Sequence, residues 1–197
     1  PDALRGHCTP SGVVALAAAV CYGEAAVLRI LWMHSSVVML LRAVLEALCA
    51  FWMIGLGLSW LWRGWKNPTR SLTPAVLGSV IFYWCVLARF MENSSSWHRV
   101  QPTAAVWQEL AALLFLAALA RTLYLPQPEN GRTLHAAALA AFCLCLCWEL
   151  PRVFLLLAAG FGGGMAAVLP ELLSGLALCY IGGMGLACIG QGKAGNN

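Results

Sequence analysis

The sequence predicts an all-α, polytopic transmembrane helical bundle of about six spans, with five spans as the alternative. Three observations predict this fold class: an apolar composition, apolar stretches long enough to cross a bilayer, and short polar turns between them. Of the 197 residues, 61% are hydrophobic and 10% are charged, whereas soluble domains have roughly 45–50% and 25%. A soluble fold of this size could not hide so much apolar surface, so lipid must cover it.

A membrane span needs ~20 mostly apolar residues. The last two-thirds of the chain contains four such stretches, separated by polar segments such as PQPENGR, which is rich in turn-forming residues. We predict spans at residues 72–91, 102–125, 133–160 and 164–190.

The first third of the chain is less clearly divided, because residues 12–62 contain no segment with the composition of a loop. We divide this stretch into spans at 12–33 and 36–62, with a tight turn near His34. The alternative is a short interfacial helix followed by one long tilted span. In either case we expect residues 1–197 to form a single transmembrane domain.

Six spans place both termini on one side of the membrane, and the basic residues indicate which side. That side carries Arg5, Arg63, Lys66, Arg70, Arg121, Arg132 and Lys193. The other, charge-poor side has Arg89 and Arg99, with Arg29 near the same border, and the glycosylation sequon at Asn93. The positive-inside rule therefore predicts both termini on the cytoplasmic, matrix or stromal side. An organellar inner membrane and an endomembrane both fit.

Several function classes receive no support from the sequence. The net charge of +4 does not indicate nucleic-acid binding, because the basic residues flank apolar runs and form no patch with polar aromatics. Cys143, Cys145 and Cys147 have a metal-like spacing, but alternate residues of a helix point ~200° apart. Nucleotide-binding and nucleophile motifs are missing. We predict no metal, no cofactor besides bound lipid and no identifiable catalytic residue, which disfavours an enzyme.

The candidate site consists of ionisable residues inside the predicted spans. An isolated charge at the bilayer centre costs roughly 2.5–3.5 kcal/mol on insertion scales, so these side chains must pair, become neutral or face water. Glu24 is one of them. The others form the predicted buried polar layer: Arg42, Glu46, Glu109, Glu149, Arg152 and Glu171.

Spacing along the helices predicts two local ion pairs in this layer. Arg42 and Glu46 are four residues apart, and Glu149 and Arg152 are three apart, so each pair shares a helix face. Pro151 removes a backbone donor beside the second pair and should distort that helix.

Depth estimates place residues from four different spans at one level. At ~1.5 Å per residue, that level lies roughly 10 Å below the charge-poor surface. The four residues are Arg42, Glu109, Arg152 and Glu171. Glu109 and Glu171 have no partner on their own helix, which makes them the stronger functional candidates.

Small residues recur at spacings that let membrane helices approach closely. They are Gly55, Gly57 and Ser59, Gly160 and Gly164, and Gly182, Gly183 and Gly185. These surfaces, together with charges that can satisfy one another, favour an accessory or scaffold subunit of a larger membrane complex. Its expected partners are the bilayer and other membrane subunits. The alternative is a small transporter or lipid-handling membrane enzyme that uses the Arg/Glu layer.

Overall fold

A computed structural model of the chain describes residues 8–32, 37–62, 72–91, 100–125, 130–158 and 165–194. All regular elements in these segments are helices, which confirms the predicted fold class. In chain order they are α2 (Thr9–Trp32), α3 (Val37–Leu61), α4 (Thr73–Met91), α5 (Val100–Tyr124), α6 (Asn130–Ala141), the π-helix η2 (Phe142–Trp148), α7 (Glu149–Ala158) and α8 (Met165–Ala194).

Residues 12–62 form two separate helices, α2 and α3, which are 24 and 25 residues long. Five helices in the described segments are long and apolar enough to cross a membrane, and these two are among them. The short interfacial helix that the five-span alternative requires here is therefore not observed. The apolar helix that falls short is instead Thr73–Ala88 within α4. The whole of α4, with 19 residues, extends about 28 Å, close to the ~30 Å thickness of the hydrocarbon layer.

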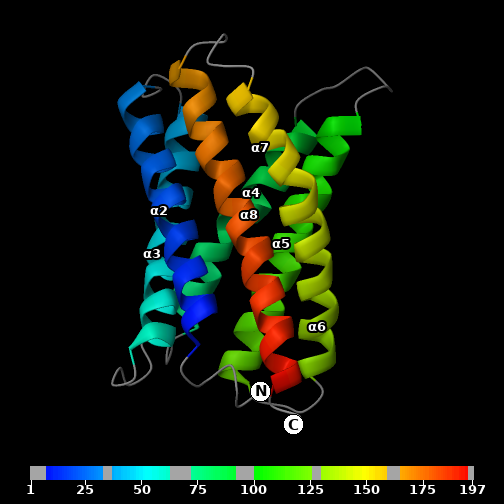
Figure 1. Cartoon of the computed structure of the whole chain (residues 1–197). Coiled ribbons are helices and arrows are strands. Elements are labelled where there is room, and N and C mark those ends of the chain that lie inside the picture. The colour runs from blue at the N-terminus through cyan, green and yellow to red at the C-terminus, as the bar shows by residue number, and fades with distance from the viewer. Residues whose placement is uncertain are drawn as a thin grey trace.

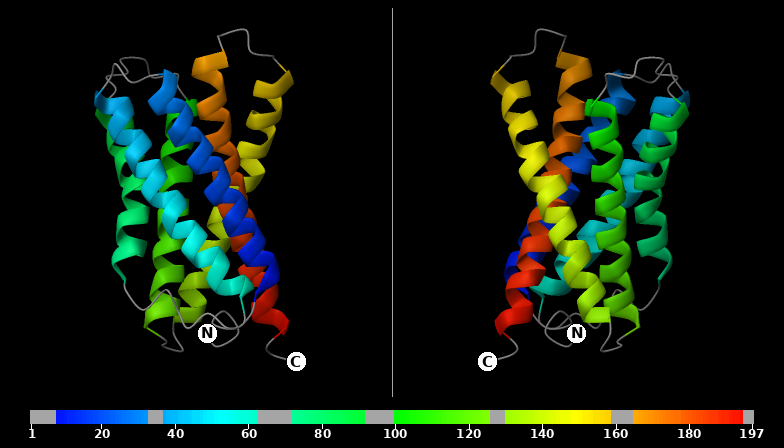
Figure 2. Two further views of the ribbon diagram at one scale, coloured as in Figure 1. Left: turned by 90° about the vertical axis from the view of Figure 1, so that its left-hand side faces the viewer. Right: turned by 90° about the vertical axis from the view of Figure 1, so that its right-hand side faces the viewer.

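The helices form a closed ring. Around it, α2 contacts α3, α3 contacts α4, α4 contacts α5, α5 contacts α6, and α6 and α8 complete the circuit back to α2. Figures 1 and 2 show the helices side by side, with the start of α2 and the end of α8 at the same end of the bundle. This is the arrangement that an even number of crossings requires. The side of the membrane on which these ends lie stays a prediction.

The predicted fifth span is not one regular α-helix. It consists of α6, the seven-residue π-helical segment η2 and α7. Pro151 lies in the first turn of α7. Proline has no N–H for the carbonyl four residues earlier, and its ring crowds that carbonyl. The wider π-helical turn lies on this N-terminal side of Pro151, where the regular hydrogen-bonding pattern is interrupted.

Glycines permit two close helix contacts. A Cβ atom on Gly57 of α3 would lie 3.0 Å from the backbone oxygen of Gly12 of α2. On α8, a Cβ atom on Gly182 would lie 2.7 Å from the backbone nitrogen of Leu146, and a Cβ atom on Gly185 would lie 2.8 Å from the backbone oxygen of Ala138. These backbones touch because the glycines have no side chain, as the small-residue spacing predicted.

The other glycines of the predicted small-residue faces behave differently. Gly55 has open space where a side chain would lie, so the prediction that it permits close packing is wrong. Gly183 is in ordinary van der Waals range of Val14. Gly160 and Gly164 lie outside the described residues.

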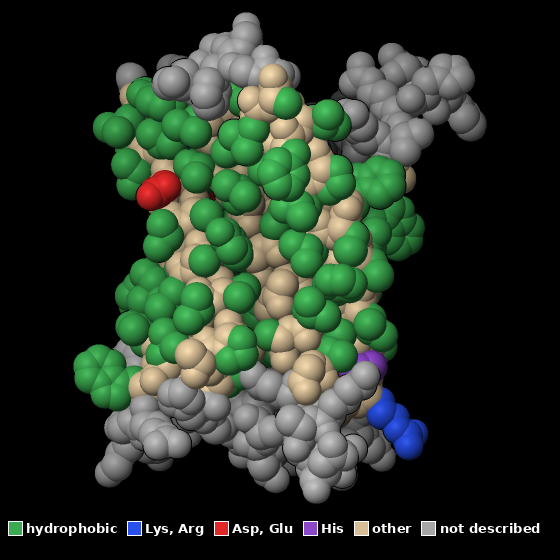
Figure 3. All heavy atoms as spheres, viewed as in Figure 1, with side chains coloured by type: hydrophobic (Ala, Val, Ile, Leu, Met, Phe, Trp, Pro, Cys, Tyr) green, Lys and Arg blue, Asp and Glu red, His purple; other side chains and the backbone are tan. Residues whose placement is uncertain are grey.

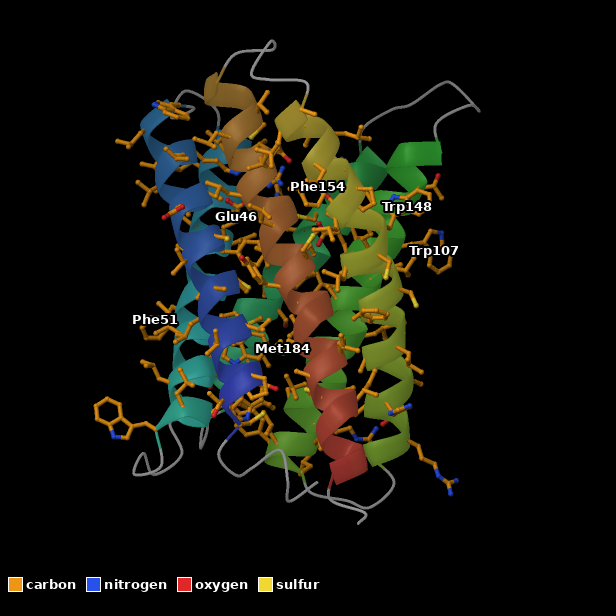
Figure 4. All side chains as sticks on the ribbon, in the orientation of Figure 1. Glu46, Phe51, Trp107, Trp148, Phe154 and Met184 are labelled. Atoms are coloured by element: carbon orange, nitrogen blue, oxygen red, sulfur yellow. The ribbon has the colours of Figure 1, made fainter. Side chains whose placement is uncertain are left out.

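The outer surface is largely apolar. Figure 3 shows hydrophobic side chains over most of the described part of one face, with one basic side chain at the lower border. Figure 4 shows Phe51, Trp107, Trp148 and Phe154 pointing away from the bundle, whereas Met184 lies inside it. Large exposed side chains of this kind require a hydrocarbon solvent, and together with the five long apolar helices they indicate an integral membrane protein.

The contact between α8 and α6 can be tested at Gly185. In Gly185→Ala, the new methyl group would collide with the Ala138 carbonyl, which belongs to the backbone and cannot rotate away. Overpacking of this kind costs about 1–3 kcal/mol, so we expect a lower melting temperature in detergent. Gly190→Ala on the same helix is the matched control, because no atom lies within 4 Å of its added Cβ. Equal melting temperatures for the two variants would contradict the tight crossing.

Candidate functional site: an arginine–glutamate cavity

Arg29 of α2 is the most deeply buried of the site's cations. Its side chain is 1% exposed and reaches two carboxylates on two other helices. Its Nε donates to Oε2 of Glu46 on α3 over 3.0 Å, and its Nη2 donates to Oε1 of Glu171 on α8 over 2.9 Å. One guanidinium therefore connects α2, α3 and α8.

Arg42 joins the same two carboxylates from the other side. It lies one turn before Glu46, and its Nε donates to Glu46 Oε1 over 3.3 Å. Its Nη1 lies 3.1 Å from Glu171 Oε1. Arg29, Glu46, Arg42 and Glu171 thus alternate in sign and form a four-charge cluster. When all four groups are ionised, their charges cancel.

Ser174 completes the cluster from α8. Its hydroxyl oxygen accepts from Arg29 Nη2 over 3.3 Å. The hydroxyl proton can be donated either to Glu46 Oε1 at 3.1 Å or to the Pro170 carbonyl one turn earlier at 2.9 Å. Ser174 is buried, so this bonding satisfies a polar group that would otherwise be costly inside the bundle.

A second polar group lies where η2 meets α7. Glu149 is buried and accepts from Arg152 Nη1 over 3.2 Å. Gln108 of α5 uses its amide nitrogen twice, donating to Glu149 Oε2 over 2.8 Å and to the Leu144 carbonyl of η2 over 3.1 Å. Gln108 therefore anchors both the carboxylate and the irregular helix that precedes it.

Gly175 of α8 makes room for this carboxylate. A Cβ atom on Gly175 would lie 2.8 Å from Glu149 Oε1. The absence of a side chain lets Glu149 lie directly against the α8 backbone, close to the four-charge cluster. Any larger residue at position 175 would push the carboxylate away from α8.

Both polar groups face one partly open cavity of about 350 Å³, which is lined by residues of α3, α4, α5, α7 and α8. Five of the six residues predicted from the sequence are in its wall, together with the polar residues Cys85, Gln108 and Ser174. These five are Arg42, Glu109, Glu149, Arg152 and Glu171. The sixth, Glu46, lies behind Arg42, and Figure 4 shows it in the upper half of the bundle.

The cavity lies toward the end of the bundle opposite the start of α2 and the end of α8. Arg29 is three residues before the end of α2, Arg42 is five residues after the start of α3, and Glu171 is six after the start of α8. These intervals correspond to depths of roughly 5–10 Å. The four residues that the sequence placed at one level, Arg42, Glu109, Arg152 and Glu171, all line this cavity.

Sequence reasoning missed Arg29, which it placed at the membrane border. Helical steps of three and four residues before Arg29 reach Ala26, Ala25, Tyr22 and Ala18, all of which the structure buries. In the sequence, this stripe is no more apolar than the stripe that contains Glu24, so it does not mark the inner face. Arg29 continues that inward face. Glu24 is the opposite case, because it was counted among the buried charges but is exposed on the outside of α2.

Gln108, Ser174 and Gly175 were also missed. Their contributions depend on which helices are neighbours, and a single sequence does not reveal this. Within the described segments, no three His, Cys, Asp or Glu side chains come together as a group that could hold a metal ion.

Comparisons of this chain with protein-family models, with curated proteins and with solved structures found no match. The geometry of the cavity therefore carries the functional argument.

Arg29 should contribute strongly to stability. Arg29→Ala would leave Glu46, itself 1% exposed, with one fewer cation, and breaking a buried ion pair typically costs about 3–5 kcal/mol. Arg29→Lys should be intermediate, because one ammonium lacks the planar fork that reaches both carboxylates. Arg132→Ala, at an exposed position of α6, is the control. Thermal unfolding in detergent, followed by tryptophan fluorescence, measures all three, and equal losses for Arg29→Ala and Arg132→Ala would refute this role.

Proposed function

We propose that this integral membrane protein is a small transporter that binds a polar solute in the arginine–glutamate cavity. One observation carries the proposal: ionisable side chains from α3, α5, α7 and α8 surround open space inside an apolar bundle. Charges that served only to hold helices together could close on one another and leave no such space. A volume of about 350 Å³ is in the range of ligand pockets, which is roughly 300–1,000 Å³.

The charges around the cavity favour a cationic solute. Three arginines and four glutamates line the cavity or lie directly behind it. When these seven groups of the described segments are all ionised, their charges sum to −1, and the solute we propose is a cation that would offset it. The arginines are Arg29, Arg42 and Arg152, and the glutamates are Glu46, Glu109, Glu149 and Glu171.

In this proposal, the interrupted helix α6–η2–α7 changes conformation during transport. Interrupted helices line the binding sites of many transporters, because their irregular backbone can bend there. Here η2 directly precedes Glu149 and Arg152. Bending at η2 would move these two residues relative to Glu171 and Arg42, which are held by the four-charge cluster. With the basic loops on the cytoplasmic, matrix or stromal side, the solute would enter from the opposite side.

The accessory-subunit hypothesis remains a second candidate. The four-charge cluster supports it, because its charges cancel and it joins three helices as a structural lock would. Bound lipids on the apolar surface fit either function. Glu109→Gln and Glu171→Gln discriminate between the candidates: loss of transport with intact assembly supports the transporter, whereas loosened assembly with unchanged transport supports the subunit.

Cys85 in the cavity wall provides a direct test of the proposed aqueous site. In protein reconstituted into liposomes, we expect a membrane-impermeant, cationic thiol reagent to modify Cys85 at least about threefold faster than an anionic one of equal size, because the ionised groups that the structure describes around the cavity sum to a negative charge and attract cations. Cys85→Ser is the control: it retains the signal of the other cysteines, which is subtracted to obtain the modification of Cys85. Absence of Cys85 modification by both reagents, applied from either side, would refute a solute-accessible cavity.

Solute binding can be detected as thermal stabilisation. A ligand that binds the folded state raises the melting temperature as its concentration exceeds its dissociation constant. We expect at least one member of a panel of inorganic cations and small amines to stabilise the wild type, and Glu109→Gln to reduce that gain. Glu24→Gln removes a carboxylate outside the cavity and should retain it. If the cation raises the melting temperatures of Glu109→Gln and Glu24→Gln equally, binding in the cavity is refuted.

A further inference from the structure

Glu24 is a carboxylate on the outside of a membrane-spanning helix. It is exposed, and it lies eight residues before the end of α2 at Trp32, which corresponds to about 12 Å along the helix. Figure 3 shows an acidic group among apolar side chains on the face that α2 forms. A short carboxylate at this depth would face hydrocarbon, which is costly. Among the described residues, no cation lies within ion-pair distance of it.

Glu24 lies in a regular outward stripe along α2. Successive members of the stripe alternate four and three residues apart, which is the 3.5-residue spacing of a seam between packed helices. We call this stripe the α2 outer face. Its members are Val13, Ala17, Val20, Glu24, Val27 and Leu31.

The composition of the α2 outer face also suits contact with another helix. Its three valines and its leucine are each more than half exposed, and Ala17 is half-buried. Small and β-branched side chains let a second helix approach closely in lipid, and a polar group between them can hydrogen-bond across the contact. The inner face of α2, by contrast, is already covered by α3 and α8.

We propose that the α2 outer face is the docking surface for a transmembrane helix of another protein that carries an arginine or lysine at the level of Glu24. The carboxylate identifies the partner's chemistry, because a cation neutralises it where neither water nor lipid tails can. A second copy of this chain fits poorly. Two copies share one orientation in the membrane, so a symmetric contact along this seam would bring Glu24 against Glu24.

The test uses a synthetic membrane-spanning Leu/Ala peptide with a single arginine at the depth of Glu24, and the same peptide with leucine there. Association with the full chain in lipid nanodiscs is measured by energy transfer between fluorescent labels. We expect the wild type to prefer the arginine peptide by about three- to tenfold, Glu24→Gln to reduce this preference, and Glu24→Leu to abolish it. An equal affinity of the wild type for both peptides would overturn the proposal.

A matched pair of variants tests whether the peptide binds at this face. Val20 on the α2 outer face and Val76 on α4 are 57% and 53% exposed. Val20→Trp should block the seam and weaken binding of the arginine peptide about tenfold, as expected when a central contact of an interface is disrupted, while Val76→Trp should not. Equal binding by the two variants would place the contact elsewhere. If Glu24→Leu instead strengthens self-association without any peptide preference, a second copy is the occupant and the proposal fails.

None of the residues in this test lines the cavity. Failure of the docking proposal therefore leaves the solute-binding proposal intact, and the reverse also holds.

Discussion

The structure depends above all on the contact between the Arg29 guanidinium and two carboxylates inside an apolar bundle. A charged group in hydrocarbon lacks the water that would solvate it, so its counter-charge and its hydrogen bonds must come from the protein. Glu46 supplies both from the next helix in the chain, and Glu171 supplies both from α8, 142 residues away. The positions of α2, α3 and α8 relative to one another follow from satisfying these groups together, since displacing one helix would leave a charge unpaired.

The two halves of the bundle have different physical characters. Toward the start of α2, helices meet through glycines at backbone contact, as at Gly57 and Gly185, and leave little freedom to move. Toward the opposite end, helices meet through charged side chains, and several of these line the cavity. The π-helical segment η2 lies between α6, which packs tightly on α8, and α7, which carries Glu149 and Arg152. The cavity wall therefore combines regular helices with one interrupted helix.

Two charged residues of α2 have different environments because they lie on different faces of the helix. Glu24 and Arg29 are five residues apart on α2, and both are surrounded in sequence by apolar residues. Five residues correspond to about 500° of helical rotation, which places them on clearly different faces. Arg29 points inward and is held by two carboxylates, whereas Glu24 points outward into the region of lipid or a partner. The inner charge joins three helices of this chain, and the outer one is the group on which the proposed docking of a partner helix depends.

The sequence alone determined the fold class and the approximate level of the polar layer. Both follow from local properties: a run of ~20 apolar residues must be helical in lipid because its backbone groups have no other partners. A residue's distance from the span end then gives its depth. The same reasoning located Arg42, Glu109, Glu149, Arg152 and Glu171, which the structure brings to one cavity.

Only the tertiary structure decided which charge pairs with which. Glu171 has no partner on its own helix, yet it lies between Arg29 and Arg42, which belong to two other helices. Depth leaves rotation about the helix axis and the order of helices around the ring undetermined, and these two quantities set the pairing. They result from the packing of all the helices at once, through small residues such as Gly175 and Gly182 whose importance depends on what lies opposite. For this reason, the inward Arg29 and the outward Glu24 became distinguishable only when the ring was complete.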